Sequence, residues 1–587
     1  MRDGRRRDSD HSERLQRGRS SAYAGASTSA FDQGFPSGRA RFVVIIFLAI
    51  AAIFAIRLVY LQVIVAQDYS QEAESGRTVE VTLNPKRGTI YDRNGRVLAT
   101  SIEATTVYCN PQEIEDADAT AKSIAEILGG KADDYKEALT TEGTFFAYVK
   151  RQADADLAEQ LRALDLPGIY FLSDSKRVYP NGSTCAQIIG LVNVDGEGLT
   201  GLEYYYDDIL SGQAGTMTLE QGATGITING TEQVTDPVAG EDITISIDID
   251  LQQKVEESVT DMASDMEAKS GQAVVLDGAT GEILACASTP LLDPTNTENI
   301  EDRATECQCI TRAFEPGSVF KTATMLAALE NGSVTPTESF YCPSALSADE
   351  YEVTDAHERS AETMTATDIL VRSSNVGISL IAEKMGFDTL NDKIATYGLD
   401  ATATGVDYPG ESAGYLLDFS EWSRIQGYNI SFGQGISETP LALCRFYGAI
   451  ADGGTAYTPH FLISRGSGEN VGWASSVISS DQDAISEVTD MLTQVVSEGT
   501  GTGAQIEGFT PAGKTGTAEY VEEGKEDEGY VEGCYNNSFV GFLPNTNSKL
   551  VCFVGATEVP SETATTETFR DIMSFAIERY NISSTQE

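Results

Sequence analysis

An unbroken apolar segment near the N-terminus constrains this chain more than any other feature of its 587 residues. Residues 42–56 carry no polar side chain, and after Arg57 the apolar run continues to residue 66. A helix of about 25 residues is about 37 Å long, enough to cross a bilayer with some tilt. Arg57 can extend its guanidinium toward water from the outer half of the bilayer. The sequence therefore predicts a transmembrane anchor over residues 42–66.

The residues before this segment predict its orientation. Residues 1–41 are rich in Ser, Gly and Arg and carry nine arginines against five acidic residues. This composition is typical of a disordered tail, and the arginines place it in the cytoplasm. A cleaved signal peptide is the alternative, but its apolar core spans only about 7–15 residues. We expect an uncleaved single-pass anchor with about 520 residues outside the membrane, as in a bacterial envelope protein.

Composition excludes some classes of function. The chain carries 89 acidic and 40 basic residues, a net charge of −49. Nucleic acid is therefore not an expected partner, because phosphate binding needs a basic face. Only three histidines are present, at positions 11, 357 and 460, which disfavours histidine-dependent catalysis.

The nine cysteines are an odd, scattered set and do not indicate a disulfide framework. Cys307 and Cys309 form a C-x-C pair, but no second pair or nearby histidine completes a zinc site. We expect no metal and no cofactor. Cys286, Cys307, Cys309 and Cys342 are expected to be small packing residues, although a pair could be oxidised outside the cell.

Hydrophobic periodicity predicts an α+β fold. Helical and strand-like patterns alternate up to about residue 237 without a cluster of chemically suggestive residues. Further on, two strands flank the turn at residues 277–281. Three more strands and a closing helix are predicted near the C-terminus, at 514–521, 538–543, 550–556 and 563–580. An antiparallel sheet built from both ends of a domain, with helices between, is an α+β arrangement.

The first candidate active-site motif is Ser318-Val319-Phe320-Lys321, at the start of an apolar helix. Residues i and i+3 share a helix face at about 5–6 Å, so Lys321 is expected to reach Ser318. A serine hydroxyl needs an adjacent base, and lysine is a base only when neutral, which burial and a second cation favour. Alone the pattern is weak: an ordinary helix cap is the preferred interpretation, and Ser173 and Lys176 repeat the pattern without an apolar helix.

Two further motifs add weight. Ser373-Ser374-Asn375 lies between helical stretches and offers a hydroxyl and an amide. Lys514-Thr515-Gly516-Thr517 begins a strand and offers a cation, two hydroxyls and a glycine that admits substrate to the backbone. Separately these fit a polar turn and an edge strand. In this order, S-x-x-K, S-x-N and K-T-G are a specific combination.

With these motifs the chain resembles the class B penicillin-binding proteins, monofunctional peptidoglycan D,D-transpeptidases, and most of all their division-specific group (penicillin-binding protein 3) and its sporulation relatives. The resemblance covers about residues 42–580. It includes further stretches, to which we assign structural roles, at residues 87–95, 177–182, 190–198, 201–203, 433–435 and 439–441.

The resemblance implies four parts in chain order: a cytoplasmic tail, a single transmembrane helix, an elongated α+β pedestal domain and a penicillin-binding transpeptidase domain. The last is built like a β-lactamase, with an antiparallel sheet flanked by helices. The expected bounds are 1–41 for the tail, 42–66 for the anchor, 67–237 for the non-catalytic, dimerisation-type pedestal and 238–583 for the transpeptidase domain.

The resemblance also implies the roles of the motif residues. Ser318 resembles the acylated nucleophile and Lys321 its general base. Ser373 resembles the hydroxyl that relays protons, and Asn375 the amide that contacts substrate and Lys321. Lys514 resembles the cation near the substrate carboxylate.

The K-T-G strand and the nucleophile turn supply the remaining groups. Thr515, Gly516 and Thr517 resemble substrate-binding residues. The backbone N–H groups of Ser318 and Thr517 resemble the oxyanion hole.

The implied reaction has two steps. Ser318 attacks the D-Ala-D-Ala bond of a peptidoglycan stem peptide and expels D-Ala, and the amine of a neighbouring stem peptide then takes the acyl group. β-Lactams are expected to acylate the same serine. The implied partners are a SEDS-type glycosyltransferase and division proteins in the membrane, at the division septum.

Three alternatives stay open. One is a D,D-carboxypeptidase or β-lactamase, in which water releases the acyl group. Two features weigh against a class A β-lactamase: Ser374 stands in place of the aspartate of S-D-N, and a Glu-x-x-Leu-Asn run is absent between residues 375 and 514. Another is an elongation- or sporulation-specific transpeptidase. A third is a penicillin-sensing receptor or inactive scaffold, disfavoured by the single apolar span and the intact motifs. The acidic run at residues 519–532 is expected to be a solvated hairpin loop.

Overall fold

The computed structural model describes residues 37–64, 78–220, 233–348, 350–466, 468–521 and 529–585. It consists of two units, Met1–Thr78 and Val79–Glu587, which are described separately. Residues 1–36 of the predicted tail (1–41) and the last two residues of the predicted anchor lie outside the described residues.

The N-terminal unit contains helix α1 (Ser37–Val59), which continues as the π-helical turn η1 (Tyr60–Ile64). Within the described residues, Arg41–Gln62 is the one segment long and apolar enough to cross a membrane, with a mean hydropathy of 3.0 and none of it buried. The helix begins five residues before the predicted anchor. The prediction followed hydropathy, whereas a helical backbone also accepts the polar residues 37–41.

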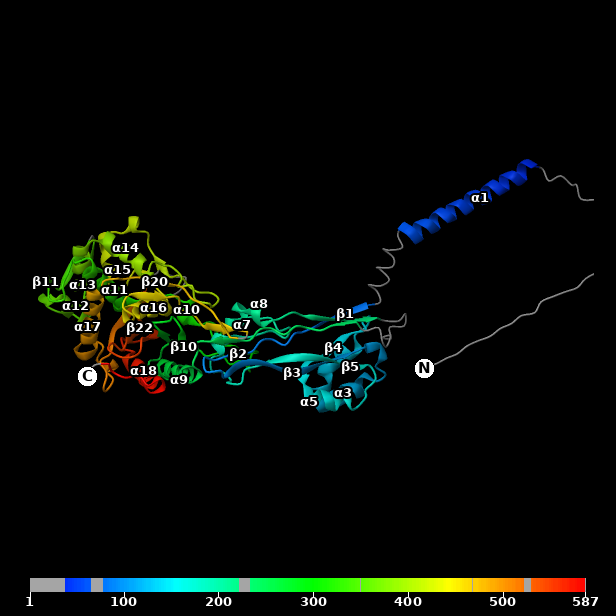
Figure 1. Ribbon diagram of the computed structural model, residues 1–587, viewed down its shortest axis with the longest axis horizontal. Helices are drawn as coiled ribbons and strands as arrows, with labels where there is room; N and C mark the ends of the chain where they lie inside the picture. Colours follow the sequence, from blue (N-terminus) through cyan, green and yellow to red (C-terminus); the bar gives the residue numbers. More distant parts are fainter. Residues whose placement is uncertain are drawn as a thin grey trace, which may run out of the picture. The chain divides into compact units, whose positions relative to one another are not determined.

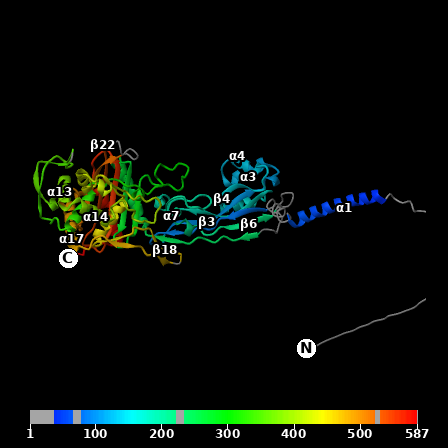
Figure 2. The same cartoon turned by 90° about the horizontal axis from the view of Figure 1, so that it is seen from above.

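One sheet joins the region before residue 237 to the region after it. Its order is β19-β18-β8-β2-β3-β4, and β5 pairs with the other edge of β3. Figure 2 shows β3 and β4 side by side. The strands are β2 (Ile90–Tyr91), β3 (Val97–Cys109), β4 (Ala147–Asp154), β5 (Ile169–Val178), β8 (Ile243–Ile245), β18 (Leu462–Arg465) and β19 (Glu469–Asn470).

Helices α3 (Ala117–Leu128), α4 (Ala132–Thr140) and α5 (Ala155–Arg162) share a small apolar core with β3 and β5. The turn at Asn94-Gly95 joins β2 to β3, and Gly95 has a φ of +80°, a conformation that glycine adopts without a steric cost. A second sheet contains β1 (Thr78–Leu83), β6 (Gly215–Glu220) and β7 (Gln233–Thr235), and the short helices are α6 (Ala186–Ile189), α7 (Gly201–Tyr205) and α8 (Asp207–Leu210).

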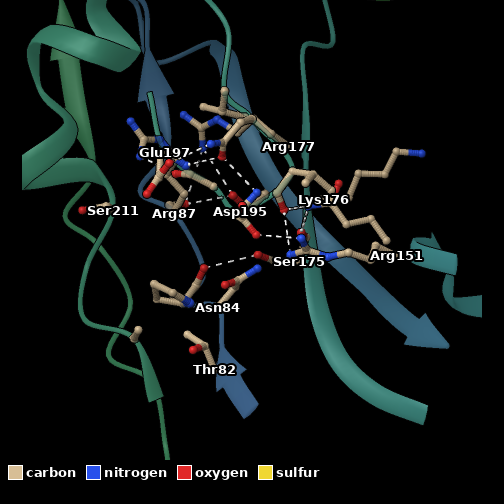
Figure 3. Close-up of a pocket in the computed structure, with 18 of the residues that line it drawn as sticks. Thr82, Asn84, Arg87, Arg151, Ser175, Lys176, Arg177, Asp195, Glu197 and Ser211 are labelled. Atoms are coloured by element: carbon tan, nitrogen blue, oxygen red, sulfur yellow. Dashed lines mark hydrogen bonds and ion pairs between the residues drawn. The ribbon is translucent and has the colours of Figure 1, made fainter. Parts of the chain in front are cut away.

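A buried ion cluster holds the stretches that carry the family resemblance in this region. The fully buried Glu203 carboxylate accepts from the guanidiniums of Arg87 and Arg177, and Arg87 also pairs with Asp207 at 2.6 Å. Arg87 and Arg177 lie in the wall of a polar cleft of about 890 Å³ (Figure 3). The two contacts of Arg87 join residues more than 100 positions apart, which supports the structural role assigned to these stretches.

The C-terminal part of this unit contains a five-stranded antiparallel sheet with helices on both faces (Figure 1). Its strands, in spatial order, are β10 (Ile283–Ser288), β9 (Ser270–Asp277), β23 (Leu550–Val559), β22 (Tyr530–Phe542) and β21 (Ala512–Val521). The predicted antiparallel sheet, with strands from both ends of the domain, is confirmed.

The two faces of the sheet have separate apolar cores because side chains alternate along each strand. Ala273 and Val275 pack with α9 (Ile249–Asp265) and α18 (Thr566–Tyr580). Val274 and Leu276 face the larger core on the other side. The helices of that core include α11 (Lys321–Glu330), α12 (Ala366–Val371), α13 (Asn375–Met385), α14 (Phe387–Tyr397), α15 (Arg424–Ser431), α16 (Pro440–Ala451) and α17 (Gln482–Glu498).

Short elements complete this part of the chain. The two-stranded pairs are β11 (Ser339–Cys342) with β14 (Glu362–Thr365), β12 (Ala345–Ala348) with β13 (Tyr351–Thr354), β15 (Tyr415–Leu416) with β16 (Ile436–Ser437), and β17 (Thr455–Tyr457) with β20 (Ser475–Val477). Helix α10 (Gln308–Thr311) precedes the first motif. Residues 522–528, within the predicted acidic loop, lie outside the described residues.

Replacing Glu203 by alanine tests the structural role of the buried ion cluster. The change removes the carboxylate that two buried guanidiniums share, although Arg87 keeps its pair with Asp207. We expect the free energy of unfolding to fall by about 3–5 kcal/mol. Urea denaturation followed by circular dichroism measures it. Asp195→Ala is the matched control, because its pair with Arg151 is 57% exposed on the Asp195 side and such a pair contributes about 1 kcal/mol at most. Equal losses in both variants would contradict the assignment.

Candidate active site

The turn that carries Ser318 is clamped between two other segments. Residues 317–320 form a 3₁₀ turn, η3, and α11 follows, so the predicted helix opens in a tighter form. Gly317 has a φ of +54°, its N–H donates to the Gly433 carbonyl at 2.9 Å, and a Cβ there would lie 2.6 Å from the Thr517 carbonyl oxygen. Ser318, at the start of this turn, is half-buried. Its position is therefore fixed from both sides.

Lys321 is fully buried, at 0% exposure. Its Nζ donates to the Ser373 carbonyl oxygen and to Asn375 Oδ1, both at 2.6 Å, and lies 3.2 Å from Ser373 Oγ. These acceptors are uncharged, and within the described residues no carboxylate pairs with the amine to compensate a buried positive charge. The first two motifs, separate in sequence, thus share one set of hydrogen bonds.

The backbone between α12 and α13 presents these acceptors. Ser373 has a φ of +60°, an uncommon conformation for a residue other than glycine. The next residues hold it in place: Ser374 Oγ donates to both carboxylate oxygens of Asp355 at 2.9 and 3.0 Å, and Val376 N–H donates to the same carboxylate at 2.9 Å. Asp355 also pairs with Arg359. Asp355 therefore anchors the turn.

Lys514 extends from β21, the edge strand of the sheet, and is also fully buried. Its Nζ donates to Ser373 Oγ at 3.0 Å and to the Thr515 carbonyl oxygen at 3.1 Å. A Cβ on Gly516 would lie 2.8 Å from the Pro316 carbonyl oxygen. The glycine thus lets the strand approach the nucleophile turn, and Ser373 Oγ stands between the two lysine amines.

Burial changes the acid–base properties of both amines. Burial lowers the pKa of Lys321 well below its usual value, and the positive charge of Lys514 lowers it further, while Asp355 acts in the opposite direction. Burial also lowers the pKa of Lys514, to about 7. A neutral amine keeps a lone pair with which it can accept a proton. The site therefore holds an amine able to accept a proton on the residue one turn after Ser318.

Most of the predicted site residues come together, with one difference. Lys321, Ser373, Asn375 and Lys514 form one hydrogen-bonded group, and Thr517 lies against the Ser318 turn. The expected direct link is missing: among the described residues, no hydrogen bond joins Ser318 Oγ to Lys321 Nζ. The reason is that the amine is occupied by the closer acceptors on the S-x-N turn.

The second S-x-x-K pattern lies elsewhere. Ser173 and Lys176 belong to strand β5, and the partly exposed Lys176 pairs with Asp154 at 3.4 Å. Sequence reasoning missed two contact residues of the site itself, Asp355 and Thr500. Thr500 Oγ1 lies 2.7 Å from Thr515 Oγ1. The Gly-Thr-Gly stretch at 499–501 was a visible signal for Thr500, whereas Asp355 is one acidic residue among many.

The fold and the site define a class: an α+β protein in which a half-buried serine precedes a buried lysine by one turn, with a second buried lysine on the neighbouring sheet edge. A family model for the penicillin binding protein transpeptidase domain matches residues 271–574. A model for the penicillin-binding protein dimerisation domain matches residues 82–245. The chain belongs to the class B penicillin-binding proteins.

Named relatives agree with this assignment. Stage V sporulation protein D of Bacillus subtilis is 31% identical over 87% of this chain and 80% of its own length. Peptidoglycan D,D-transpeptidase FtsI of Escherichia coli is 32% identical over 85% of this chain and 82% of its own. The crystal structure of penicillin-binding protein 3 from Mycobacterium tuberculosis, complexed with aztreonam, has a TM-score of 0.68 and 26% identity, covering 86% of this chain and 98% of that one.

Replacing Asp355 by alanine tests its contribution to the site. Without the carboxylate, the Ser374 hydroxyl and the Val376 N–H lose their acceptor, and we expect the left-handed turn at Ser373 to relax. Labelling by a fluorescent penicillin should slow by at least about tenfold. Asp368→Ala is the control, since it removes a capping carboxylate from the neighbouring helix α12 and spares the turn. Wild-type labelling of Asp355→Ala would contradict this account.

Proposed function

We propose that this chain is a peptidoglycan D,D-transpeptidase in which Ser318 is the nucleophile and Lys321 the general base. The observation that carries the proposal is the buried Lys321 amine, one turn after Ser318, held by Ser373 and Asn375 and facing a second buried amine. The family of this chain and its named relatives support the same activity.

The first step forms an acyl-enzyme. Ser318 Oγ attacks the carbonyl carbon of the D-Ala-D-Ala bond and its proton passes to the neutral Lys321 Nζ. The N–H groups of Ser318 and Thr517 then bind the oxyanion, since Gly317 brings the turn within van der Waals contact of β21. As the tetrahedral intermediate collapses, the C–N bond breaks and the departing D-Ala nitrogen takes up a proton.

Ser373 Oγ is the proposed relay for that proton. It lies 3.2 Å from Lys321 Nζ and 3.0 Å from Lys514 Nζ, so a proton held on Lys321 can cross one hydroxyl to the leaving nitrogen. In the second step the amine of another stem peptide attacks the acyl-enzyme and loses its proton by the reverse route. Ser318 regains its proton, and a cross-link is formed.

The K-T-G strand is the proposed substrate-binding edge. Lys514 in its charged form, with the hydroxyls of Thr515 and Thr517, suits the terminal carboxylate of the donor peptide. Gly516 keeps the strand free of a side chain on the face that meets the nucleophile turn. The same groups would receive the carboxylate of a β-lactam inhibitor, which resembles the donor.

We further propose the cellular setting. The N-terminus lies in the cytoplasm, α1 crosses the membrane, and the remaining chain acts outside it, at the division septum. The basic residues before α1 and the similarity to FtsI support this setting. A separate SEDS-type glycosyltransferase and division proteins in the membrane are its proposed partners. The bounds of the tail (1–41), anchor (42–66), pedestal (67–237) and transpeptidase domain (238–583) stay predictions from the sequence.

The nucleophile is tested with a fluorescent penicillin on the purified full-length chain. Ser318→Ala should abolish covalent labelling, because no other hydroxyl occupies the start of the η3 turn. The second S-x-x-K pattern offers a matched control, and Ser173→Ala should label like the wild type. With a donor stem peptide and an acceptor amine, mass spectrometry should find the cross-linked product. Covalent labelling of the Ser318→Ala variant would contradict the nucleophile assignment. A reaction that yields only hydrolysed donor peptide and no cross-linked product would contradict transpeptidation.

The two lysines predict a bell-shaped pH profile for acylation by a β-lactam. The rate should fall on the acid side as Lys321 becomes protonated, at a pH well below the usual lysine pKa. It should also fall above about pH 7, where Lys514 loses its charge. Lys514→Arg should remove the alkaline decline, because a guanidinium stays charged. A rate that rises continuously to pH 10 would contradict a neutral Lys321 at physiological pH.

A further inference from the structure

Three buried thiols that the proposed reaction does not use lie together beside the five-stranded sheet. The Sγ atoms of Cys286, Cys307 and Cys309 are all within 4.8 Å of one another. The shortest separation, 3.2 Å, joins Cys286 Sγ to Cys307 Sγ. All three residues are 0% exposed. Cys286 belongs to β10, and the other two belong to the start of α10.

The backbone around the closest pair is held firmly. Cys286 N–H donates to Gln252 Oε1 at 2.8 Å. Ser288 lies two residues further along β10 and therefore on the same face of the strand as Cys286. Its Oγ accepts a hydrogen bond from the Gln308 N–H at 3.0 Å. The two cysteines therefore approach each other because both of their segments are fixed, and not through a chance choice of rotamer.

The remaining distance is small. A disulfide has an S–S length of about 2.05 Å, so the two sulfur atoms need to close by about 1.1 Å from 3.2 Å. Cys309 is a less suitable partner, because its Sγ lies 3.3 Å from the Ala287 carbonyl oxygen. The proposed location of this domain, outside the cytoplasm, is one where disulfides form and persist.

We propose that Cys286 and Cys307 form a disulfide that ties β10 to α10, while Cys309 stays a thiol. Each thiol gives up one hydrogen, and the two electrons and two protons reduce a disulfide of the oxidant, either glutathione disulfide or a thiol–disulfide oxidoreductase. The exchange passes through a mixed disulfide. Because the folded thiols are fully buried, it takes place during folding or local opening.

The crosslink acts on the segment that leads to the nucleophile. After α10, Phe314 N–H donates to the Glu438 carbonyl oxygen at 3.0 Å, and the η3 turn with Ser318 follows directly. Residues 287–306 form the loop that the disulfide closes, and closing a loop of about this length restricts the unfolded chain substantially. The disulfide therefore stabilises the sheet together with the approach to the active site.

The test uses the purified full-length chain in detergent, equilibrated in glutathione buffers of graded redox potential. Free thiols are alkylated, and the digested protein is analysed by mass spectrometry. We expect a Cys286–Cys307 peptide pair in the oxidising buffers and a fall in the melting temperature of about 5–10 °C on reduction. Since the oxidant is supplied in the buffer, the result does not depend on the proposed membrane topology or on the proposed reaction.

Alanine variants identify the bonded pair. For each variant the melting temperature is measured with and without reductant, so that any loss of stability from the substitution itself is the same in both measurements. Cys286→Ala and Cys307→Ala should lose the reductant-dependent shift. Cys309→Ala should keep it, as should Cys444→Ala, a buried thiol outside the cluster. The proposal is overturned if all three thiols are alkylated in every buffer, if the peptide pair contains Cys309, or if the reduced cluster instead retains one equivalent of added Zn²⁺.

Discussion

The site depends on the burial of the Lys321 amine among uncharged hydrogen-bond acceptors. Placing a charged ammonium in the protein interior costs several kcal/mol unless a counter-ion compensates it. The groups around Lys321 Nζ are a carbonyl oxygen, an amide oxygen and a hydroxyl. The carboxylate that acts on its pKa, Asp355, is already engaged by Arg359, Ser374 and the Val376 N–H. The surroundings thus favour the neutral amine, and the second amine of Lys514 reinforces this preference.

The fold explains how three distant motifs meet around one amine. Helix α11 packs in the core among α13, α14 and α17, so its first residue, Lys321, is buried. The edge strand β21 keeps one side free of a neighbouring strand, and that side meets the η3 turn. Glycines at 317 and 516 allow this approach, because a Cβ at either position would overlap a backbone oxygen. The catalytic geometry is thus a consequence of backbone contact between a sheet edge and a helix start.

Sequence patterns predicted much of this arrangement. The apolar run from residue 42 predicted a helix long enough to cross a membrane, and hydrophobic patterns predicted strands of the five-stranded sheet and the closing helix. The residues brought together around Lys321 were those of the three motifs. What pattern reasoning missed are contacts that depend on tertiary structure. Asp355 lies at the end of a short hairpin, and nothing in its local sequence shows that its carboxylate caps a turn formed by residues about twenty positions later.

The expected Ser318–Lys321 contact shows the same limit. The i to i+3 spacing places both side chains on one helix face, but the hydrogen-bond acceptors of the S-x-N turn, which lie on another segment, determine where the amine points. The cysteines are a second case. Spacing identified the pair at 307 and 309, whereas the nearest neighbour of Cys307 is Cys286, on a strand of the adjoining sheet. Local sequence fixes which face a residue occupies, and tertiary packing then selects its partners.

The most direct test of this account is the ionisation state of Lys321 itself, measured by NMR titration of the lysine ¹³Cε resonances in the free enzyme, with Lys321→Arg to assign the signal. The account predicts a chemical shift typical of a neutral amine at pH 7 and a titration only at lower pH. A Lys321 signal that stays that of an ammonium group up to about pH 10, as for an exposed lysine, would contradict it.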